Sequence, residues 1–420
     1  MRSVGLLPCR GQPGAQAPPP QNQRTPRVNN IPPEHRDDTA TVVAGGGLVG
    51  ATTALALLQR GSPVQWLRPA LSTPALPDGY AARVYALSPD NLAWLETLGV
   101  GTHLQHGRIG SVQAMEIRGP QGGLLELSAR QTGVPQMAVI VESDNLQLAV
   151  DAAIAAAGGD DRLGAAVSAQ ITAIDAGDSG MAVSLDDGVR LNTPLLVAAD
   201  GANSPLRALA GIDTVGDSYH HRAVVANFEC ERPHRGIACQ WFNHGEVLAW
   251  LPLPDRHISM VWSVPDSRAE TLLGLDDAAL VAMVGAAGDH RWGDLRLVSR
   301  PHSFALRRQR AQRLVGPRLA LVGDAAHVVH PLAGQGLNLG LRDVRELLAA
   351  TRSARDPGEA RLLNRYQALR QHDVRAIECL TDGLFRLFKS PLAGYLGGQG
   401  LSLLNHVSPI KSQLVKLALR

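Results

Sequence analysis

The stretch TVVAGGGLVG, residues 41–50, predicts the fold of this protein. Its glycines Gly45, Gly47 and Gly50 match the pattern GxGxxG, directly after a short apolar run that predicts a buried strand. The first glycine permits a tight turn, the second lets a pyrophosphate approach the backbone, and the third lets the next helix pack against the strand. Because the N-terminus of that helix would face an anion, the stretch predicts a dinucleotide-binding turn.

The residues after this turn complete a strand–helix–strand unit. Residues 51–60 are good helix formers that end before Gly61, and 64–67 (VQWL) predict a second strand. An acid that holds a ribose hydroxyl should end the second strand, but the next residue is Arg68. Three interpretations stay open: the arginine contacts the 2′-phosphate of NADP, meets an adenosine differently, or weakens dinucleotide affinity. The turn alone does not decide between NAD(P) and FAD.

Composition excludes several classes of protein. The 420 residues carry 40 basic and 38 acidic side chains, a balance that argues against a dedicated nucleic-acid binder. No apolar run approaches the roughly 18–20 residues of a membrane span. The cysteines lack the CxxC spacing of a zinc site, and nothing suggests a disulfide framework. We therefore expect a two-domain protein in a reducing, cytoplasmic compartment.

Two further polar turns follow apolar strands, and these turns, together with the glycine turn, are called corners below. DGANSPLR, residues 200–207, and GDAAH, residues 323–327, each place a carboxylate at the carboxyl end of a strand, where ligands bind in open α/β sheets. Asp324 is suited to accept a hydrogen bond from a ribityl hydroxyl. Asp200 and Arg207 are candidates to line a pyrophosphate and the entry path of a reductant. Taken alone, either corner is more often simple turn chemistry.

The stretch HPLAGQGLNLGLRD, residues 330–343, is more specific. Gly334 and Gly336 flank Gln335 just before a helix predicted for 338–353. Bare backbone N–H groups at a helix start attract an anionic oxygen. Negative charge in a reduced flavin gathers near N1 and the C2 carbonyl, so a helix aimed there would stabilise the reduced ring.

A different pattern occupies residues 219–265. Apolar patches alternate there with turns at intervals of about 10–13 residues, which favours an antiparallel sheet. We expect this sheet to form one face of a second domain.

These corners, in this order and at these separations, resemble those of the FAD-dependent aromatic hydroxylases of the para-hydroxybenzoate hydroxylase type. Residues 330–343 are similar, more narrowly, to the ubiquinone-biosynthesis hydroxylase subfamily. The segment ARVYALSPDNLAWLETLGV resembles the one whose arginine lies near the flavin, here Arg83. VESDNLQLAV resembles a family helix start, with Ser143 where asparagine is usual. The more serious departure is Arg68 in place of the ribose-binding acid.

The resemblance implies an α/β fold with a Rossmann-like FAD-binding domain, a second substrate domain built on a largely antiparallel β-sheet, and C-terminal helices. The FAD-binding domain should be discontinuous, with parts at 39–110, 141–215 and 309–370. The remaining parts should be a disordered N-terminal tail (1–38), a substrate domain (111–140 and 216–308) and a C-terminal helical segment (371–420).

Roles for single residues also follow from the resemblance. The residues implied to contact FAD are Gly45, Gly47, Gly50, Arg83, Asp200, Gly201, Asp324, Pro331, Gly334, Gln335, Gly336 and Asn338. Asp324 holds the ribityl chain. The residues that pack along the isoalloxazine are Pro331, Gly334, Gln335, Gly336 and Asn338. Substrate candidates lie on the antiparallel sheet, although aromatic residues on alternating strands are more often core: Gln240, Trp241, Phe242, Trp250 and Trp262.

Two histidines, His327 and His330, have HxxH spacing. No carboxylate or cysteine cluster accompanies them, so we predict no metal site. Either histidine could act as a general base, and the sequence does not choose between them.

The activity implied by the resemblance is that of an FAD-dependent monooxygenase using NAD(P)H and O2. It hydroxylates the aromatic ring of a prenylated phenol or benzoquinol in ubiquinone biosynthesis, through a flavin C4a-hydroperoxide. The flavin carries this chemistry, so no catalytic residue is assigned. Two alternatives stay open: the same chemistry on a soluble aromatic substrate, or a weakly flavin-binding accessory protein of a biosynthetic complex.

The C-terminal segment bears on the substrate, which the resemblance implies to be lipophilic. Its apolar residues have basic neighbours and could lie on a membrane surface, or could close the core or a partner interface. The first interpretation predicts a cytoplasmic protein, peripheral to the inner face of the membrane. The apolar residues are Leu384, Phe385, Leu387, Phe388, Leu392, Leu396, Leu414, Val415, Leu417 and Leu419.

Overall fold

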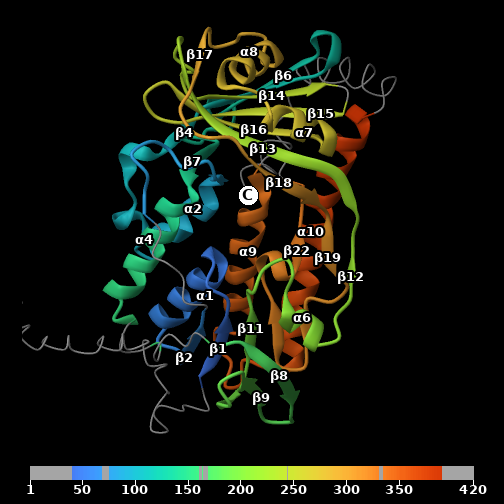
Figure 1. Ribbon diagram of the computed structural model, residues 1–420. Helices are drawn as coiled ribbons and strands as arrows, with labels where there is room; N and C mark the ends of the chain where they lie inside the picture. The colour runs from blue at the N-terminus through green and yellow to red at the C-terminus, as the bar shows by residue number, and fades with distance from the viewer. Residues whose placement is uncertain are drawn as a thin grey trace, which may run out of the picture. The chain divides into compact units, whose positions relative to one another are not determined.

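The computed structural model describes residues 40–68, 75–159, 163, 169–243, 245–330 and 334–389 (Figure 1). Three expectations from the sequence fall outside these ranges: the tail 1–38, the cofactor contact at Pro331, and the chain after Lys389. Within the described ranges, no helix combines the length and the apolar character that crossing a membrane requires.

A five-stranded sheet carries the glycine turn. Its order is β2-β1-β11-β21-β20, and all neighbouring pairs are parallel except β21 with β20. The four parallel strands are buried along their whole length, as expected for a sheet covered on both faces. The strands predicted at 41–44 and 64–67 are confirmed. The bounds are β1 (Thr41–Ala44), β2 (Val64–Leu67), β11 (Leu196–Ala198), β20 (Val315–Gly316) and β21 (Leu319–Leu321).

Helices pack around this sheet, and the first of them starts at the glycine turn. α1 contacts both α4 and α9, and α9 packs in turn against the long helix α10 (Figure 1). The bounds are α1 (Leu48–Gln59), α4 (Ser143–Ala156), α9 (Gln335–Ala350) and α10 (Ala360–Lys389).

The start of α9 differs from the prediction. The helix was expected from residue 338 but begins at Gln335. Gly334 has φ +63°, a left-handed conformation that glycine adopts without strain, and the chain turns there directly into the helix. Gly336 therefore lies in the first turn of α9 and not in the loop before it.

The second large sheet has eight strands in the order β17-β13-β16-β15-β14-β5-β6, with β18 also paired to β13. All pairs are antiparallel except β14 with β5, so the antiparallel sheet predicted for 219–265 is confirmed. The helices α7 and α8 contact this sheet on one side (Figure 1). The bounds are β5 (Ala114–Arg118), β6 (Leu124–Ser128), β13 (Ser218–Cys230), β14 (Ile237–Asn243), β15 (Glu246–Pro252), β16 (His257–Pro265), β17 (Leu295–Leu297), β18 (His302–Arg307), α7 (Asp266–Leu273) and α8 (Asp277–Ala287).

Smaller elements complete the described chain. Three-stranded sheets have the orders β3-β7-β4, β10-β9-β8 and β12-β19-β22. The domain limits predicted from the sequence remain a proposal, and the limit between residues 370 and 371 falls inside α10. The bounds are β3 (Val84–Leu87), β4 (Gly110–Val112), β7 (Ala138–Glu142), β8 (Ile171–Ala176), β9 (Met181–Leu185), β10 (Arg190–Thr193), β12 (Thr214–Val215), β19 (Gln309–Ala311), β22 (His327–Val328), α2 (Pro89–Thr97), α3 (Ala129–Thr132) and α6 (Pro205–Leu209).

Candidate functional site

A deep cleft lies at the carboxyl ends of the parallel strands. Its volume is about 1330 Å³, and all three polar corners identified in the sequence border it. Gly47 comes from the turn after β1, Asp200 follows β11, and Asp324 follows β21. Residues far apart in the sequence therefore meet at one site because adjacent parallel strands end at the same edge of the sheet.

The glycine turn has the geometry that an elongated anion requires. Gly45 has φ +133°, and a Cβ atom there would lie 2.1 Å from the carbonyl oxygen of Ala199. A Cβ atom at Gly50 would lie 2.2 Å from the carbonyl oxygen of Gly45, so this glycine brings α1 close to β1. At Gly47 a Cβ atom would meet no other atom within 4 Å, and this residue borders the cleft. Gly45 and Gly50 thus shape the turn, and Gly47 leaves the space where a pyrophosphate fits.

The two carboxylates offer acceptors to a ligand in the cleft. Asp200 accepts the backbone N–H of Leu206 at 3.0 Å through Oδ2, whereas its buried Oδ1 has no hydrogen-bond partner in the described part of the chain. Burial raises the pKa of the Asp200 carboxyl. Asp324 borders the cleft. Desolvation by the surrounding protein raises the pKa of its carboxyl, although the charges of His327 and Arg83 act to lower it. Hydroxyl groups of a cofactor are suitable donors to both, so these residues fit FAD.

Arg207, expected to line the pyrophosphate, does not border the cleft. Its side chain is buried and donates to the carbonyl oxygens of Ala325 at 2.9 Å and Ala202 at 3.0 Å. It therefore joins the second and third corners to each other. Gly201, the other member of this corner, does border the cleft.

A second, smaller cavity opens beside the cleft. Its volume is about 140 Å³. Both spaces are lined by Arg83, Val84, Phe304 and Gly334, so Arg83 stands where the two meet. Its contact with a flavin remains a proposal. The other lining residues are mostly apolar and come largely from the eight-stranded sheet and from the sheet β3-β7-β4.

The segment that carries Arg83 is held by residues that the sequence reasoning did not identify. Glu142, at the end of β7, is fully buried, and its carboxylate lies 2.7 Å from both Nε and Nη2 of Arg108. The same carboxylate accepts the backbone N–H of Ala81 at 2.6 Å. Asn227 donates to the carbonyl oxygen of Ala81 at 3.0 Å. An acid at the end of an apolar strand, VIVE, was the available signal for Glu142.

The substrate candidates divide between the two faces of the large sheet. Gln240 lines the small cavity, together with Ala249 and Val261 on the neighbouring strands. Phe242 points to the same face but packs in a hydrophobic core beside the cavity.

The three tryptophans predicted to contact the substrate do not line the small cavity. Trp241, Trp250 and Trp262 pack on the other face with side chains from α7 and α8, away from the cavity. Each tryptophan directly follows a cavity residue on its own strand: Gln240, Ala249 or Val261. Because side chains of a strand alternate between faces, each tryptophan lies on the opposite face.

The two histidines of the HxxH pair occupy different environments. His330 lines the small cavity, and its Nε2 lies 3.4 Å from Oγ of Ser263. His327 instead lies 2.7 Å from Oδ2 of Asp343 through Nε2, in the core between α9 and β22. Of the two, only His330 can touch a molecule in the cavity. Among the described residues, no cluster of three or more His, Cys, Asp or Glu could hold a metal ion.

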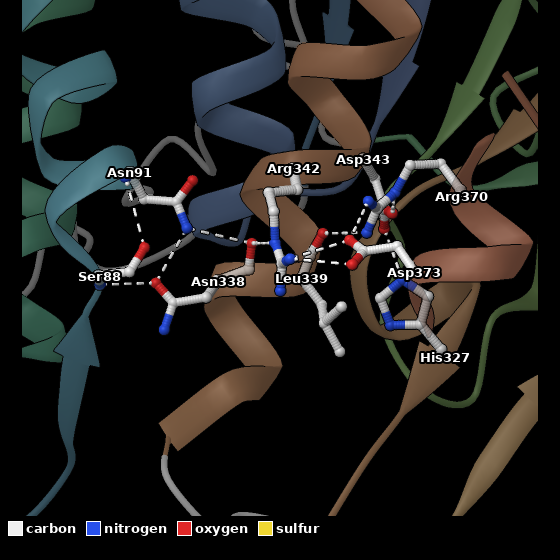
Figure 2. Close-up of polar contacts among 9 residues, drawn as sticks. All are labelled: Ser88, Asn91, His327, Asn338, Leu339, Arg342, Asp343, Arg370 and Asp373. Carbon is white, nitrogen blue, oxygen red and sulfur yellow. Dashed lines mark hydrogen bonds and ion pairs between the residues drawn. The ribbon is translucent and has the colours of Figure 1, made fainter. Parts of the chain in front are cut away.

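Asn338 acts as a bridge between elements. Its Oδ1 accepts the backbone N–H of Ser88 at 3.0 Å and the side-chain amide of Asn91 at 2.9 Å (Figure 2). Its own amide donates to the carbonyl oxygen of Ala86 at 2.8 Å. Asn338 borders the small cavity, as does Gln335, whose buried Oε1 has no partner in the described chain. Asn338 thus fixes the start of α9 against β3, the strand that follows Arg83.

A buried ionic cluster holds the third corner. Asp343 on α9 accepts a hydrogen bond from Nε of Arg370 at 2.7 Å and contacts His327 (Figure 2). It also accepts the backbone N–H of Gly323 at 2.9 Å. Burial acts to raise the pKa of the Asp343 carboxyl, but His327 and Arg370 hold it below its ordinary value. Because Gly323 directly precedes Asp324, this cluster ties α10 to the position of the cleft carboxylate.

Comparisons with known proteins agree with this geometry. Residues 38–381 match the family described as FAD binding domain. The ubiquinone hydroxylase UbiL of Rhodospirillum rubrum is 35% identical over 390 residues, covering 90% of this chain and 89% of that protein. The 3-demethoxyubiquinol 3-hydroxylase of Escherichia coli is 31% identical, covering 91% and 98%.

A solved structure, Klebsiella pneumoniae HpxO in complex with FAD and uric acid, is similar with a TM-score of 0.70. The likeness covers 91% of this chain and 97% of that one at 20% identity, and it therefore supports the fold alone.

Proposed function

Since the chain belongs to the family of FAD-dependent aromatic hydroxylases of the para-hydroxybenzoate hydroxylase type, with ubiquinone hydroxylases among its relatives, we propose that it hydroxylates the ring of a prenylated phenol or benzoquinol in ubiquinone biosynthesis. One observation carries this proposal: a small apolar cavity opens into the FAD cleft at Arg83 and Gly334. An aromatic ring held there would lie beside a flavin ring placed at the start of α9, and apolar walls suit a lipophilic substrate.

When bound, FAD would supply the redox chemistry, since it accepts electrons from NAD(P)H and activates O2. The chain itself contributes placement. The turn at Gly47 would receive the pyrophosphate, Asp324 would accept a hydrogen bond from a ribityl hydroxyl, and the first backbone N–H groups of α9 would face the flavin ring. Apolar residues of the small cavity, such as Val261, exclude water from the reacting ring.

The polar groups of the small cavity suit a phenolic hydroxyl. His330 and Ser263 lie together on its wall, and Gln240 lines it as well. We assign to Nε2 of His330 the role of accepting the phenolic proton, because a more electron-rich ring is a better nucleophile towards oxygen. The amide of Gln240 then orients a second oxygen substituent of the ring.

The experiment is quinone profiling of a deletion strain by mass spectrometry, combined with turnover of the purified enzyme under ¹⁸O2. We expect a ring lacking one hydroxyl to accumulate in the strain, and one ¹⁸O atom to enter a prenylated phenol in vitro. Normal quinone content, in a strain without a paralogue, would refute the pathway. Equal turnover of unprenylated phenols would favour a soluble aromatic substrate instead.

We also propose that the protein meets the membrane from the cytoplasmic side through its C-terminal segment. The support is the sequence pattern there, in which apolar residues such as Leu414 and Leu417 neighbour Lys411 and Lys416. Binding to anionic liposomes at low salt, lost on truncation after Ser390, is the expected result. Unchanged liposome binding after that truncation would move the contact elsewhere, and no binding at all would refute it.

A further inference from the structure

A cation and a carboxylate from separate elements meet at the adenosine end of the FAD cleft. Arg68 directly follows β2, at the place where the dinucleotide fold normally has its ribose-binding acid. Asp151 lies on α4, and its Oδ1 is 3.9 Å from Nη1 of Arg68. Both residues line the cleft. The end of β2 carries no acid, but Asp151 of α4 places a carboxylate beside it.

The arginine is held against the glycine turn. Its guanidinium stacks on the ring of Trp66, with 4.5 Å between Cζ and the ring centroid. Trp66 is buried and donates its indole N–H to the carbonyl oxygen of Gly45 at 2.8 Å. Arg68 is therefore placed relative to the turn that receives the pyrophosphate, and the ribose of a dinucleotide lies next to that turn.

The carboxylate is held from its own helix as well. Gln147, one turn earlier on α4, donates its side-chain amide to Oδ1 of Asp151 at 3.2 Å and also lines the cleft. Burial raises the pKa of the Asp151 carboxyl, while Gln147 and Arg68 oppose this shift. Both contacts are made to Oδ1, and together they orient the Asp151 carboxylate.

We propose that Asp151 accepts hydrogen bonds from the ribose hydroxyls of the FAD adenosine, and that Arg68 serves to position this carboxylate. Charged acceptors bind hydroxyl donors more strongly than neutral ones do. The same carboxylate disfavours a 2′-phosphate, because two negative groups would share the site. Arg68 is therefore not the 2′-phosphate contact of an NADP site. The inference rests on FAD binding by this family and goes beyond it to the residues that hold the ribose.

The test measures FAD affinity of the full chain, stripped of flavin and titrated by the quenching of flavin fluorescence. We expect Asp151→Asn to weaken FAD binding by roughly 10-fold, the effect of losing one hydrogen bond to a charged group. The matched control is Asp356→Asn. Asp356 also pairs with an arginine, Arg318, and its side chain is 33% exposed against 30% for Asp151, but it lies outside the cleft. We expect this control to leave FAD affinity within about twofold of the wild-type value.

A cofactor analogue separates direct contact from a structural role. FAD with a 2′-deoxyadenosine ribose should bind the wild-type protein more weakly than FAD does, and Asp151→Asn should weaken the analogue much less than it weakens FAD. Equal losses for FAD and the analogue would overturn the proposal, because the substitution would then act through the fold. FMN, which lacks the adenosine, should bind both proteins equally.

Arg68→Ala provides the second measurement. We expect it to weaken FAD binding, with little further loss when it is combined with Asp151→Asn. If Arg68→Ala instead lowers the preference for NADPH over NADH and leaves FAD affinity unchanged, the positioning role is wrong. A wild-type protein that takes up no FAD would refute the proposed function as a whole. This outcome differs from the two that refute only the roles of Asp151 and Arg68.

Discussion

The cofactor cleft and the small apolar cavity share a border but are built in different ways. The cleft is bordered by turns at the ends of parallel strands, and these turns carry glycines and the carboxylates of Asp200 and Asp324. The cavity is formed by side chains from the interior face of an antiparallel sheet. The conformation of a turn depends on a few adjacent residues. The lining of a cavity by strand side chains depends on which strands pair and in what register. The first kind of site is therefore visible in a sequence and the second is not.

The largest effect that we predict concerns two glycines of the same turn. Gly50→Ala should destabilise the protein by more than about 4 kcal/mol, because the new Cβ atom would lie 2.2 Å from the carbonyl oxygen of Gly45. Gly47→Ala should change stability by less than about 1 kcal/mol, since its Cβ atom enters open space, yet it should weaken FAD binding at least about 10-fold. Urea unfolding and flavin titration measure the two quantities. Similar stability losses for both variants would contradict the division between shaping the turn and receiving the ligand.

The second prediction contrasts the two faces of the large sheet. Trp250→Ala should cost about 3–5 kcal/mol, because this fully buried ring packs edge-on against Trp241 at 4.8 Å between centroids. It should leave the preference among substrates unchanged, since the ring lies away from the cavity.

Its neighbour in sequence should behave in the opposite way. Ala249→Phe fills the small cavity and should lower turnover of the prenylated phenol by roughly 100-fold while FAD affinity stays the same. A changed substrate preference in Trp250→Ala, with little loss of stability, would contradict the assignment of faces.

A third prediction concerns the buried cluster beneath the cleft. Asp343→Asn should destabilise the protein by about 3 kcal/mol at pH 7, because it leaves Arg370 without its buried partner carboxylate. The pKa of Asp343 is lowered by folding, so its stabilising effect is present above the ordinary value of 3.8 and is lost as the pH falls below it. The difference between variant and wild type should therefore shrink in acid. A difference that stays constant between pH 7 and pH 3 would show that the charge of Asp343 is not the cause.

The smallest effect is chemical and leaves stability unchanged. Burial raises the pKa of Cys230 and of Cys239 to about 12, so both thiols should stay protonated and unreactive at pH 8. Cys379 on α10 is exposed and should be alkylated in the native protein. Peptide mapping after brief treatment with iodoacetamide distinguishes them. Modification of Cys239 at the rate of Cys379 would mean that the core between the large sheet and the helices α7 and α8 opens readily.

Much of the fold could be predicted because its signals are local. The strand at 41–44, the glycine turn and the strand at 64–67 follow from adjacent residues. Glycine is required at Gly45 by its φ of +133°, and at Gly50 because a Cβ atom would lie against the carbonyl oxygen of Gly45. The antiparallel sheet was likewise visible in the repeated apolar patches. The helix start at Gln335 was placed three residues too late, because the left-handed conformation of Gly334 shows only in the structure.

The sequence by itself predicted that three glycine-and-aspartate corners follow buried strands and meet at one ligand site, and Gly47, Asp200 and Asp324 do border one cleft. The tertiary structure decided the rest. It turned the tryptophans away from the cavity, selected His330 over His327, and brought Asp151 to Arg68 across 83 positions of the chain. The reason is physical: backbone conformation is set by neighbouring residues, whereas the direction of a side chain and its partner depend on packing between distant elements.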